Sequence, residues 1–419
     1  MNKQINKPRG TQDIYGNKAS TYNFLFTKFS NIAKTFGYGE IKIPMIEHIE
    51  TFVRTVGETS DIVKKEMYNF KDKGDREIAL RPEGTAGVVR AVVEDKLLYK
   101  EALPIRFYYY GSMFRYERPQ SKRLREFNQF GVELIGTNSV YDDFNVIKFV
   151  NECMESVNIK GTTIMINNLG SFESRAKWID ELKKYFKPYE KQLSELNRER
   201  LSKNPTRILD DKEDGVKDFV KKAPKVSNFL SKQEKDDFAM LLSLLKAFGI
   251  KYELDDNLVR GLDYYTGMVF EVKDKNNLAL GGGGRYAKMV EEFGGDDQSC
   301  IGMALGVDRI INYIEENKIK CGFASEDVQV VFTSLEQKFN NKALEYMLDT
   351  ISNGISAVSN FSINKLAKVF SYAEKLNASY VVIIGEKEVK EKTITYKNIK
   401  TKVQKTSSFK DFIKIFNKK

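Results

Sequence analysis

Hydrophobic residues recur along this chain with two different periods, and these periods divide it into predicted helices and strands. Over residues 22–36, apolar side chains lie three and four positions apart, which predicts an amphipathic helix that ends near Gly37. Over residues 127–135 they alternate with polar ones, which is typical of a strand. A β-rich run that begins at Ile105 precedes this strand, so the two segments together predict an antiparallel hairpin.

Three regions that differ in composition and predicted secondary structure indicate the domain organisation. Residues 170–253 carry long helical patterns dense in Lys and Glu, which predict a mostly helical insertion within a domain spanning residues 1–325. Strands and helices then alternate, so residues 326–419 predict a small α/β domain with a parallel or mixed sheet. A chain of 419 residues is long enough for two or three domains.

Charge and cysteine content narrow the class of protein. Lys and Arg number 68 and Asp and Glu 58, and the resulting net charge of +10 suits a polyanionic partner without establishing one. The three cysteines form no Cys-x-x-Cys pair, so we expect a reducing cytoplasm and neither a disulfide framework nor a structural zinc site. No stretch has the length and apolarity of a membrane span.

His48 is the single histidine of the sequence, and this count removes several kinds of active site. Zinc sites built on histidine, Ser-His-Asp triads and Cys-His dyads are all excluded. Any chemistry must therefore use carboxylates, arginines, lysines, tyrosines, backbone groups or a bound metal.

Polar residues are concentrated on one face of the predicted hairpin. Arg115 and Glu117 have strand spacing and should point the same way, as should Gln129 and Glu133 on the second strand. Burying this many polar groups is costly unless a ligand, or the groups themselves, satisfy them. The hairpin therefore favours a binding platform over a solvated sheet face, and the loop between its strands adds cations such as Arg123.

A stiff turn ahead of a predicted helix holds a carboxylate and a hydroxyl. Pro82 fixes the backbone just before Glu83, and Thr85 follows two positions later. Such a pair could hold an ammonium group, but the same pattern also suits the first turn of a helix. The two interpretations are compatible with each other.

The run 259–271 supplies a third group of candidates. It places Arg260, Tyr264 and Tyr265 before an apolar strand, where an extended backbone would point the two tyrosines to opposite faces. A surface turn followed by ordinary core aromatics fits this run equally well. Four glycines at 281–284 bar a regular helix and by themselves favour a flexible turn, although they also allow a ligand to approach the backbone.

Several of these segments resemble, in order, the signature motifs of class II aminoacyl-tRNA synthetases in their histidyl form. Residues 114–133 resemble motif 2, residues 301–309 resemble motif 3, and the region around Pro44 resembles the dimer-forming motif 1. The class I signatures are absent. Three further segments resemble the family's histidine-site segments, namely 80–85, 260–265 and 280–286.

The resemblance implies both a fold and a reaction. The fold is an α+β catalytic domain with an antiparallel sheet flanked by helices, a helical insertion, and a C-terminal α/β anticodon-binding-like domain. The reaction is that of a histidine–tRNA ligase: histidine and ATP form histidyl-adenylate and pyrophosphate, and histidine then passes to the 3′ end of tRNA(His). The family also implies a cytoplasmic homodimer without membrane contact, and Mg²⁺ held mainly through ATP.

The family pattern assigns a role to each candidate. The catalytic arginines are Arg115 and Arg309 on the ATP phosphates, and Arg260 between the histidine carboxylate and the α-phosphate. The other ATP-binding residues are Glu117 and Arg123. The remaining histidine-binding residues are Glu83, Thr85 and Gln129 at the ammonium group, and Glu133, Tyr264 and Tyr265 around the imidazole.

Four positions depart from the family pattern. Tyr116 and Asn128 stand where His is usual, Ala287 stands where Asp or Asn is usual, and Asp308 replaces Glu. None of the four carries an assigned catalytic role, although Asn128 and Ala287 could alter tRNA fit or pocket support.

Two other classes of protein compete with the enzyme. One is a non-enzymatic, histidine-sensing regulatory subunit of histidine biosynthesis, but such subunits generally lack the second domain and lose the substrate-binding residues. The other is an RNA-binding module, which explains the basic charge but not the set formed by Glu83, Glu133 and Arg260.

Overall fold

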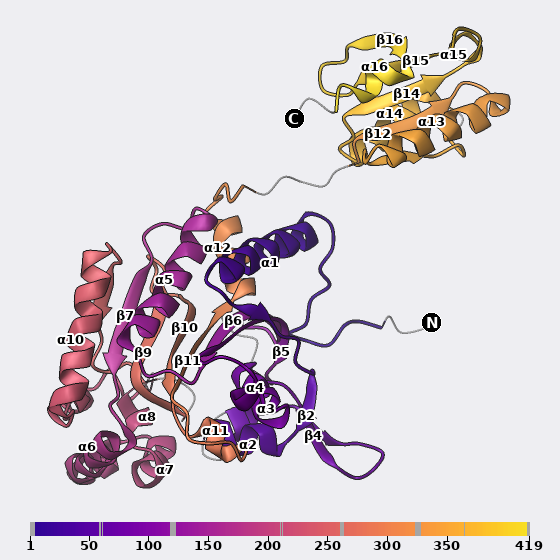
Figure 1. Ribbon diagram of the computed structural model, residues 1–419. Helices are drawn as coiled ribbons and strands as arrows, with labels where there is room; N and C mark the ends of the chain where they lie inside the picture. The colour runs from indigo at the N-terminus through magenta and orange to yellow at the C-terminus, as the bar shows by residue number, and fades with distance from the viewer. Residues whose placement is uncertain are drawn as a thin grey trace. The chain divides into compact units, whose positions relative to one another are not determined.

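The computed structural model describes residues 5–57, 60, 62–117, 123–209, 211, 213–259, 264–322, 328–363 and 365–416. The chain divides into two compact units, Met1–Phe323 and Ala324–Lys419 (Figure 1). Each unit has its own sheet and its own hydrophobic cores.

The first unit is built on a single large sheet whose central strands are antiparallel. These are, in spatial order, β5 (Ile105–Phe114), β6 (Glu126–Ile135), β11 (Cys300–Gly306), β10 (Ala279–Tyr286), β9 (Tyr265–Lys273) and β7 (Thr163–Asn168). The edge strands β1 (Gly39–Glu40) and β8 (Tyr252–Leu254) pair in parallel, so the sheet as a whole is mixed. The predicted hairpin is the β5–β6 pair, and the expected sheet flanked by helices is confirmed, antiparallel in its central strands and parallel only at its two edges.

The two faces of this sheet have different neighbours because side chains alternate along each strand. On β6, Phe130, Val132 and Leu134 enter a core shared with helices α1 (Asn17–Thr35), α5 (Val140–Ser156), α10 (Lys232–Ala247) and α12 (Val307–Glu316). Gln129 and Glu133 alternate with them and belong to the opposite face. Figure 1 shows α1 and α12 on one side of β5 and β6, and α3 (Thr85–Glu94) on the other.

A small antiparallel sheet precedes α3 and leads into it. Its order is β2 (Ile46–His48), β4 (Glu77–Leu80) and β3 (Asn69–Lys71), and α2 (Glu50–Val56) and the π-helix η1 (Ile62–Glu66) lie between β2 and β3 in the chain. Strands β3 and β4 form an antiparallel hairpin within it.

Short helices fill the chain between β7 and β8. They are α6 (Phe172–Phe186), η2 (Lys187–Gln192), α7 (Glu195–Lys203), α8 (Thr206–Leu209), α9 (Asp218–Lys221), η3 (Val226–Asn228) and α10. The helical pattern of the insertion is interrupted at Leu193, where the backbone is extended, and Asp214 accepts hydrogen bonds from the Ser194 amide and from Asn197.

The second unit has a mixed sheet with one core on each face. Strands β13 (Ala357–Ser359), β12 (Val330–Ser334) and β14 (Tyr380–Ile384) are parallel, and β15 (Thr393–Asn398) and β16 (Gln404–Ser408) continue the sheet antiparallel. Helices α13 (Asn340–Ser352), α14 (Leu366–Lys375), α15 (Glu386–Glu391) and α16 (Phe409–Ile413) accompany it. The expected α/β domain with a parallel or mixed sheet is confirmed.

Within the described parts of the two units, no helix combines the length and the apolarity that crossing a membrane requires.

Candidate active site

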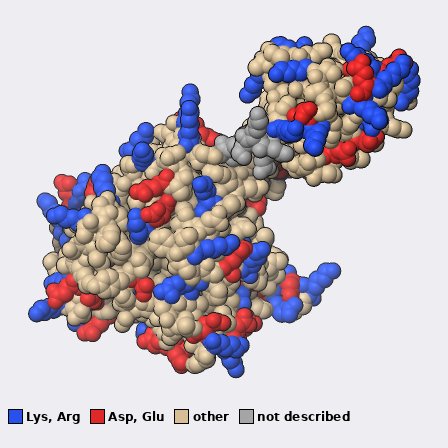
Figure 2. Space-filling view, turned by 45° about the horizontal axis from the view of Figure 1, so that its top comes forward, with Lys and Arg blue, Asp and Glu red and all other residues tan. Residues whose placement is uncertain are grey.

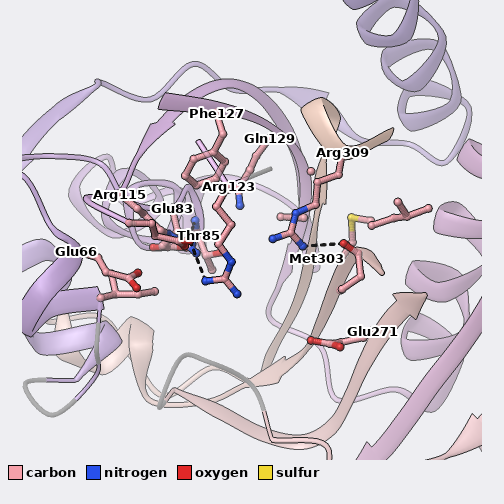
Figure 3. Close-up of a pocket in the computed structure, with 18 of the residues that line it drawn as sticks. Glu66, Glu83, Thr85, Arg115, Arg123, Phe127, Gln129, Glu271, Met303 and Arg309 are labelled. Carbon is pink, nitrogen blue, oxygen red and sulfur yellow. Dashed lines mark hydrogen bonds and ion pairs between the residues drawn. The ribbon is translucent and has the colours of Figure 1, made fainter. Parts of the chain in front are cut away.

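A pocket of about 620 Å³ opens on the face of the large sheet that carries Gln129 (Figure 3). Its walls come from the turn before α3, from β5 and β6 with their connection, from β9 and β10, from the β11–α12 junction and from the insertion. Most of the residues predicted from the sequence line it, namely Glu83, Thr85, Arg115, Glu117, Arg123, Gln129, Tyr264, Tyr265 and Arg309. Arg260 lies outside the described residues.

Glu83 lies at the floor of the pocket and caps α3. Its carboxylate accepts the backbone N–H groups of Thr85 at 2.7 Å and Ala86 at 2.8 Å, which are unpaired donors of the first helical turn. Burial raises the pKa of Glu83, and these two amides oppose that rise. The helix-start interpretation of this turn is confirmed, and the carboxylate also faces the pocket.

Glu133 is completely buried behind the pocket wall. Its Oε1 accepts a hydrogen bond from Thr85 Oγ1 at 2.7 Å, and its Oε2 accepts one from the Tyr286 hydroxyl at 2.8 Å. Burial raises the pKa of Glu133 to about 8, helped by the nearby charge of Glu83 and opposed by the two hydroxyl donors. Glu133 does not line the pocket itself. A ligand can therefore contact Glu133 only if Thr85 or Tyr286 gives up its hydrogen bond to the carboxyl group.

The ring of Tyr109 packs where two glycines leave room for it. A methyl group at Gly84 would lie 2.2 Å from the ring, and one at Gly131 would lie 2.3 Å from it. Tyr109 lines the pocket beside Gln129, whose Oε1 is buried without a hydrogen-bond partner among the described residues. An unpaired buried oxygen in a pocket wall is suited to a hydrogen-bond donor on a ligand.

Tyr264 and Tyr265 both line the pocket, with ring centroids 4.6 Å apart. The expectation that they point to opposite faces is wrong, because β9 begins at Tyr265 and Tyr264 precedes the strand. Tyr264 also meets Tyr286 edge to face at 5.7 Å, so three tyrosines form one aromatic wall.

Arginine side chains gather at the pocket mouth (Figure 3). Arg115 donates to the Pro82 carbonyl at 2.9 Å and lies over the Phe127 ring, while Arg309 donates to the Ala279 carbonyl at 2.8 Å. Burial lowers the pKa of Arg309, and the charges of Arg123 and Arg115 lower it further. Cations that repel one another around a shared space form a binding site for an anion.

Carboxylates share the mouth with these arginines. Arg123 pairs with Glu117 at 2.8 Å, and Figure 3 shows Glu66 and Glu271 directed toward the same space. No group of three or more metal-ligating side chains occurs in the described parts of the chain.

Sequence reasoning missed several residues of this site. Tyr286 lies in a segment with the expected resemblance but was given no role, and Tyr109 was read as part of a β-rich run. The sequence pattern assigned no residue of the insertion to the site, yet Arg200, Arg207 and Asp211 line the pocket, with Arg200 and Asp211 paired at 3.2 Å. No local pattern separates these insertion residues from their charged neighbours.

The glycines at 281–284 lie inside β10, so the flexible turn is wrong. A methyl group at Gly283 would lie 2.1 Å from the Gly302 carbonyl of the neighbouring strand. These glycines therefore allow β10 and β11 to pair closely under the pocket.

Comparison with known proteins agrees with this fold. A family model described as histidyl-tRNA synthetase matches residues 10–310, and one described as anticodon binding domain matches residues 328–419. The histidine–tRNA ligase of Malacoplasma penetrans is 43% identical over 98% of both chains, and that of Ureaplasma urealyticum is 40% identical over 98% of both. The crystal structure of apo histidyl-tRNA synthetase from S. aureus superposes with a TM-score of 0.83 at 32% identity, covering 99% of this chain and 100% of the other.

The fold, the arginine-rich pocket and these matches define a class II aminoacyl-tRNA synthetase, a ligase that uses ATP to attach an amino acid to tRNA. Within that class, the chain belongs to the histidyl-tRNA synthetase family, whose amino acid is histidine. The relatives are named as ligases and the anticodon-binding domain is present, so the regulatory-subunit and RNA-module alternatives are not supported.

Proposed function

We propose that the pocket binds histidine at its floor and ATP at its mouth, and joins them before tRNA(His) receives the histidyl group. One observation carries this proposal: the buried carboxylate of Glu83 and the arginines Arg115 and Arg309 line one pocket, and the buried Glu133 is bonded to its wall through Thr85. The carboxylates suit a cationic, nitrogen-rich amino acid, and the arginines suit a polyphosphate.

The floor of the pocket would hold the two ends of histidine. Glu83, Thr85 and Gln129 receive the ammonium group, which the buried free oxygen of Gln129 supports. Glu133, Tyr264 and Tyr265 surround the imidazole, whose two nitrogens need one polar partner each. An amino acid without such nitrogens would leave these buried groups unpaired, so the same contacts provide specificity.

The mouth of the pocket would hold ATP. Arg115 and Arg309 contact its phosphates, Arg123 and Glu117 lie beside them, and Arg260 bridges the histidine carboxylate and the α-phosphate. The histidine carboxylate then attacks the α-phosphate in line and pyrophosphate leaves, which requires alignment and charge neutralisation but no nucleophilic side chain.

Mg²⁺ fits this site as a companion of ATP. The ion prefers oxygen ligands and is usually held by one or two carboxylates together with substrate phosphates. Glu117 and Glu271 both line the pocket and have the required chemistry. When bound, Mg²⁺ would neutralise charge that builds on the phosphates.

The second unit would bind the anticodon of tRNA(His), and the protein would act as a cytoplasmic homodimer. The dimer proposal rests on the region around Pro44, where Met45 and Ile46 are 53% and 51% exposed. On the face shown in Figure 2, Lys and Arg are interspersed with Asp and Glu. The cytoplasm is consistent with three free, buried cysteines.

Histidine-dependent ATP–pyrophosphate exchange tests the proposal. We expect activity in the natural chain and a loss of at least about a hundredfold in kcat/KM in Arg309→Ala, because a charge-assisted contact to phosphate is removed. Arg260→Ala should behave alike. Arg76→Ala is the matched control, since the exposed Arg76 pairs only with the turn residue Asp72 among its described ionic contacts. A folded natural chain with exchange no higher than background would overturn the proposal.

A further inference from the structure

The segment just before α1 contacts the connection that carries the motif 2 arginines. The Gly10 carbonyl accepts the backbone N–H groups of Arg125 at 2.7 Å and Glu126 at 3.4 Å. Gly10 has a φ of +88°, and a methyl group there would lie 2.7 Å from Arg125 Cγ, so only glycine fits. Residues 10–12 are called the N-terminal strap below.

The other end of the N-terminal strap contacts the motif 3 carboxylate. Gln12 Nε2 donates to Asp308 Oδ1 at 2.7 Å, and the Tyr22 hydroxyl donates to the same oxygen at 2.5 Å. Asp308 Oδ2 accepts the backbone N–H of Asn128 at 2.5 Å. Asp308 and Tyr22 are 5% and 4% exposed, so the carboxylate depends on these donors to replace water.

These contacts hold residues of the pocket wall itself, because Asp308 and Asn128 both line the pocket. Asp308 precedes Arg309 at the mouth, and Asn128 precedes Gln129 at the floor. The carbonyl of Arg125 accepts the backbone N–H of Arg115 at 2.9 Å. The N-terminal strap, Tyr22 and Asp308 therefore connect the two sequence-distant segments that supply the arginines of the mouth.

We propose that Gln12, Tyr22 and Asp308 are positioning residues that fix Arg309 and the Arg115 segment relative to each other for the phosphates of ATP. The proposal rests on the assignment of those arginines to ATP made above. Glu is usual at position 308 in this family, and the shorter Asp of this chain reaches two side-chain donors and one backbone donor at once. Burial keeps the Tyr22 hydroxyl protonated by raising its pKa, so it remains a donor at all working pH values.

The proposal predicts a selective defect when a donor is removed. Tyr22→Phe keeps the buried ring and removes only the hydroxyl, and Gln12→Ala removes the second donor from a partly exposed segment. In pyrophosphate exchange we expect KM for ATP to rise about three- to tenfold in each variant, with KM for histidine changed less than about twofold. The reason for this split is that Gln12 and Tyr22 both donate to Asp308 Oδ1, next to Arg309, whereas the histidine site is reached only through the Asn128 amide on Oδ2.

A matched control separates positioning from general loss of stability. Tyr108→Phe also removes a buried tyrosine hydroxyl bonded to a carboxylate, at 3.2 Å from Glu40, and no pocket residue takes part in that contact. It should leave both KM values unchanged. The melting temperatures of all three variants are measured together with their kinetics. If Tyr22→Phe folds poorly, the KM for ATP of Gln12→Ala still tests the proposal.

Two outcomes overturn the proposal while exchange in the natural chain is intact: an unchanged KM for ATP in both variants, or equal rises for ATP and histidine. Absence of histidine-dependent exchange in the natural chain is a different result, because it contradicts the proposed function itself. A rise confined to ATP in Tyr22→Phe and Gln12→Ala, and absent from Tyr108→Phe, supports the positioning role.

Discussion

The carboxylate of Glu133 occupies the space that a side chain at Gly302 would need. The two residues are direct partners in the β6–β11 pairing, and an ideal Cβ at position 302 would lie 1.6 Å from Glu133 Oε2. The φ of Gly302 is not in the left-handed region, so the requirement for glycine is one of space. Gly302 thereby leaves Glu133 room to meet Thr85 and Tyr286 at the same time.

Gly302→Ala should therefore weaken histidine binding selectively. The added methyl group displaces the Glu133 carboxyl group and breaks its hydrogen bonds to Thr85 and Tyr286, each worth about 0.5–1.5 kcal/mol. We expect KM for histidine in pyrophosphate exchange to rise about ten- to a hundredfold, with a smaller change for ATP. Gly39→Ala is the control, because a methyl group there would come no nearer than 3.8 Å to another residue. An unchanged KM for histidine in Gly302→Ala would show that Glu133 has no part in binding it.

The buried proton of Glu133 should make stability depend on pH. In the unfolded chain this carboxyl ionises near its ordinary pKa of 4.5, whereas the folded pKa is raised to about 8. The unfolded state therefore loses its proton first, and the free energy of unfolding falls as pH rises between these values, by up to about 1.4 kcal/mol per pH unit. Above about pH 8 this contribution becomes constant, because both states are then ionised.

Glu133→Gln isolates that effect because an amide cannot ionise. The difference in melting temperature, variant minus natural chain, should grow as pH rises from about 5 to about 8. Glu83 titrates in both proteins and largely cancels in the difference. Thermal denaturation across this range measures it, and a difference that stays constant with pH would contradict a buried, proton-holding Glu133.

The local parts of the site could be predicted from the sequence. Alternation along 127–135 placed Gln129 and Glu133 on one face, and Pro82 marked the turn that presents Glu83, because both signals depend only on near neighbours. Tyr286 could not be placed in this way: it reaches Glu133 from 153 positions further along the chain. The same holds for Arg200 of the insertion, whose place in the pocket depends on tertiary packing.

The ends of the strands could not be predicted from the sequence pattern either. Arg115 and Glu117 were expected on a strand, but β5 ends at Phe114 and both residues follow it. They still line the pocket, because the backbone N–H of Arg115 remains paired with the Arg125 carbonyl. The glycines of β10 predicted a flexible turn instead of a strand. They are required by the close approach of β11, and a run of glycines does not by itself indicate such a tertiary contact.

The arginines of the mouth should differ in their effect on ATP binding. Arg123 is 45% exposed and pairs with Glu117 without ATP, so its gain from a phosphate is offset by the pair it gives up. Arg309 is more deeply buried, and its hydrogen bond to the Ala279 carbonyl fixes the orientation of its guanidinium group. We expect Arg123→Ala to raise KM for ATP about two- to fivefold, well below the loss in Arg309→Ala. Equal losses in the two variants, measured by exchange at several ATP concentrations, would contradict this order.

Removal of residues 326–419 should separate the two steps of the reaction. The first unit keeps both of its own hydrophobic cores in such a truncation, since the buried residues of the second unit form separate clusters. The proposed function places amino-acid activation in the pocket of the first unit, so pyrophosphate exchange should remain within about threefold of the full chain. Charging of tRNA(His) should fall by about a hundredfold or more, because the contacts of a whole domain with the tRNA are lost. Exchange and aminoacylation assays on the same preparation measure the two losses. Losses of equal size would mean that the second unit supports the catalytic fold and has no separate role in binding tRNA.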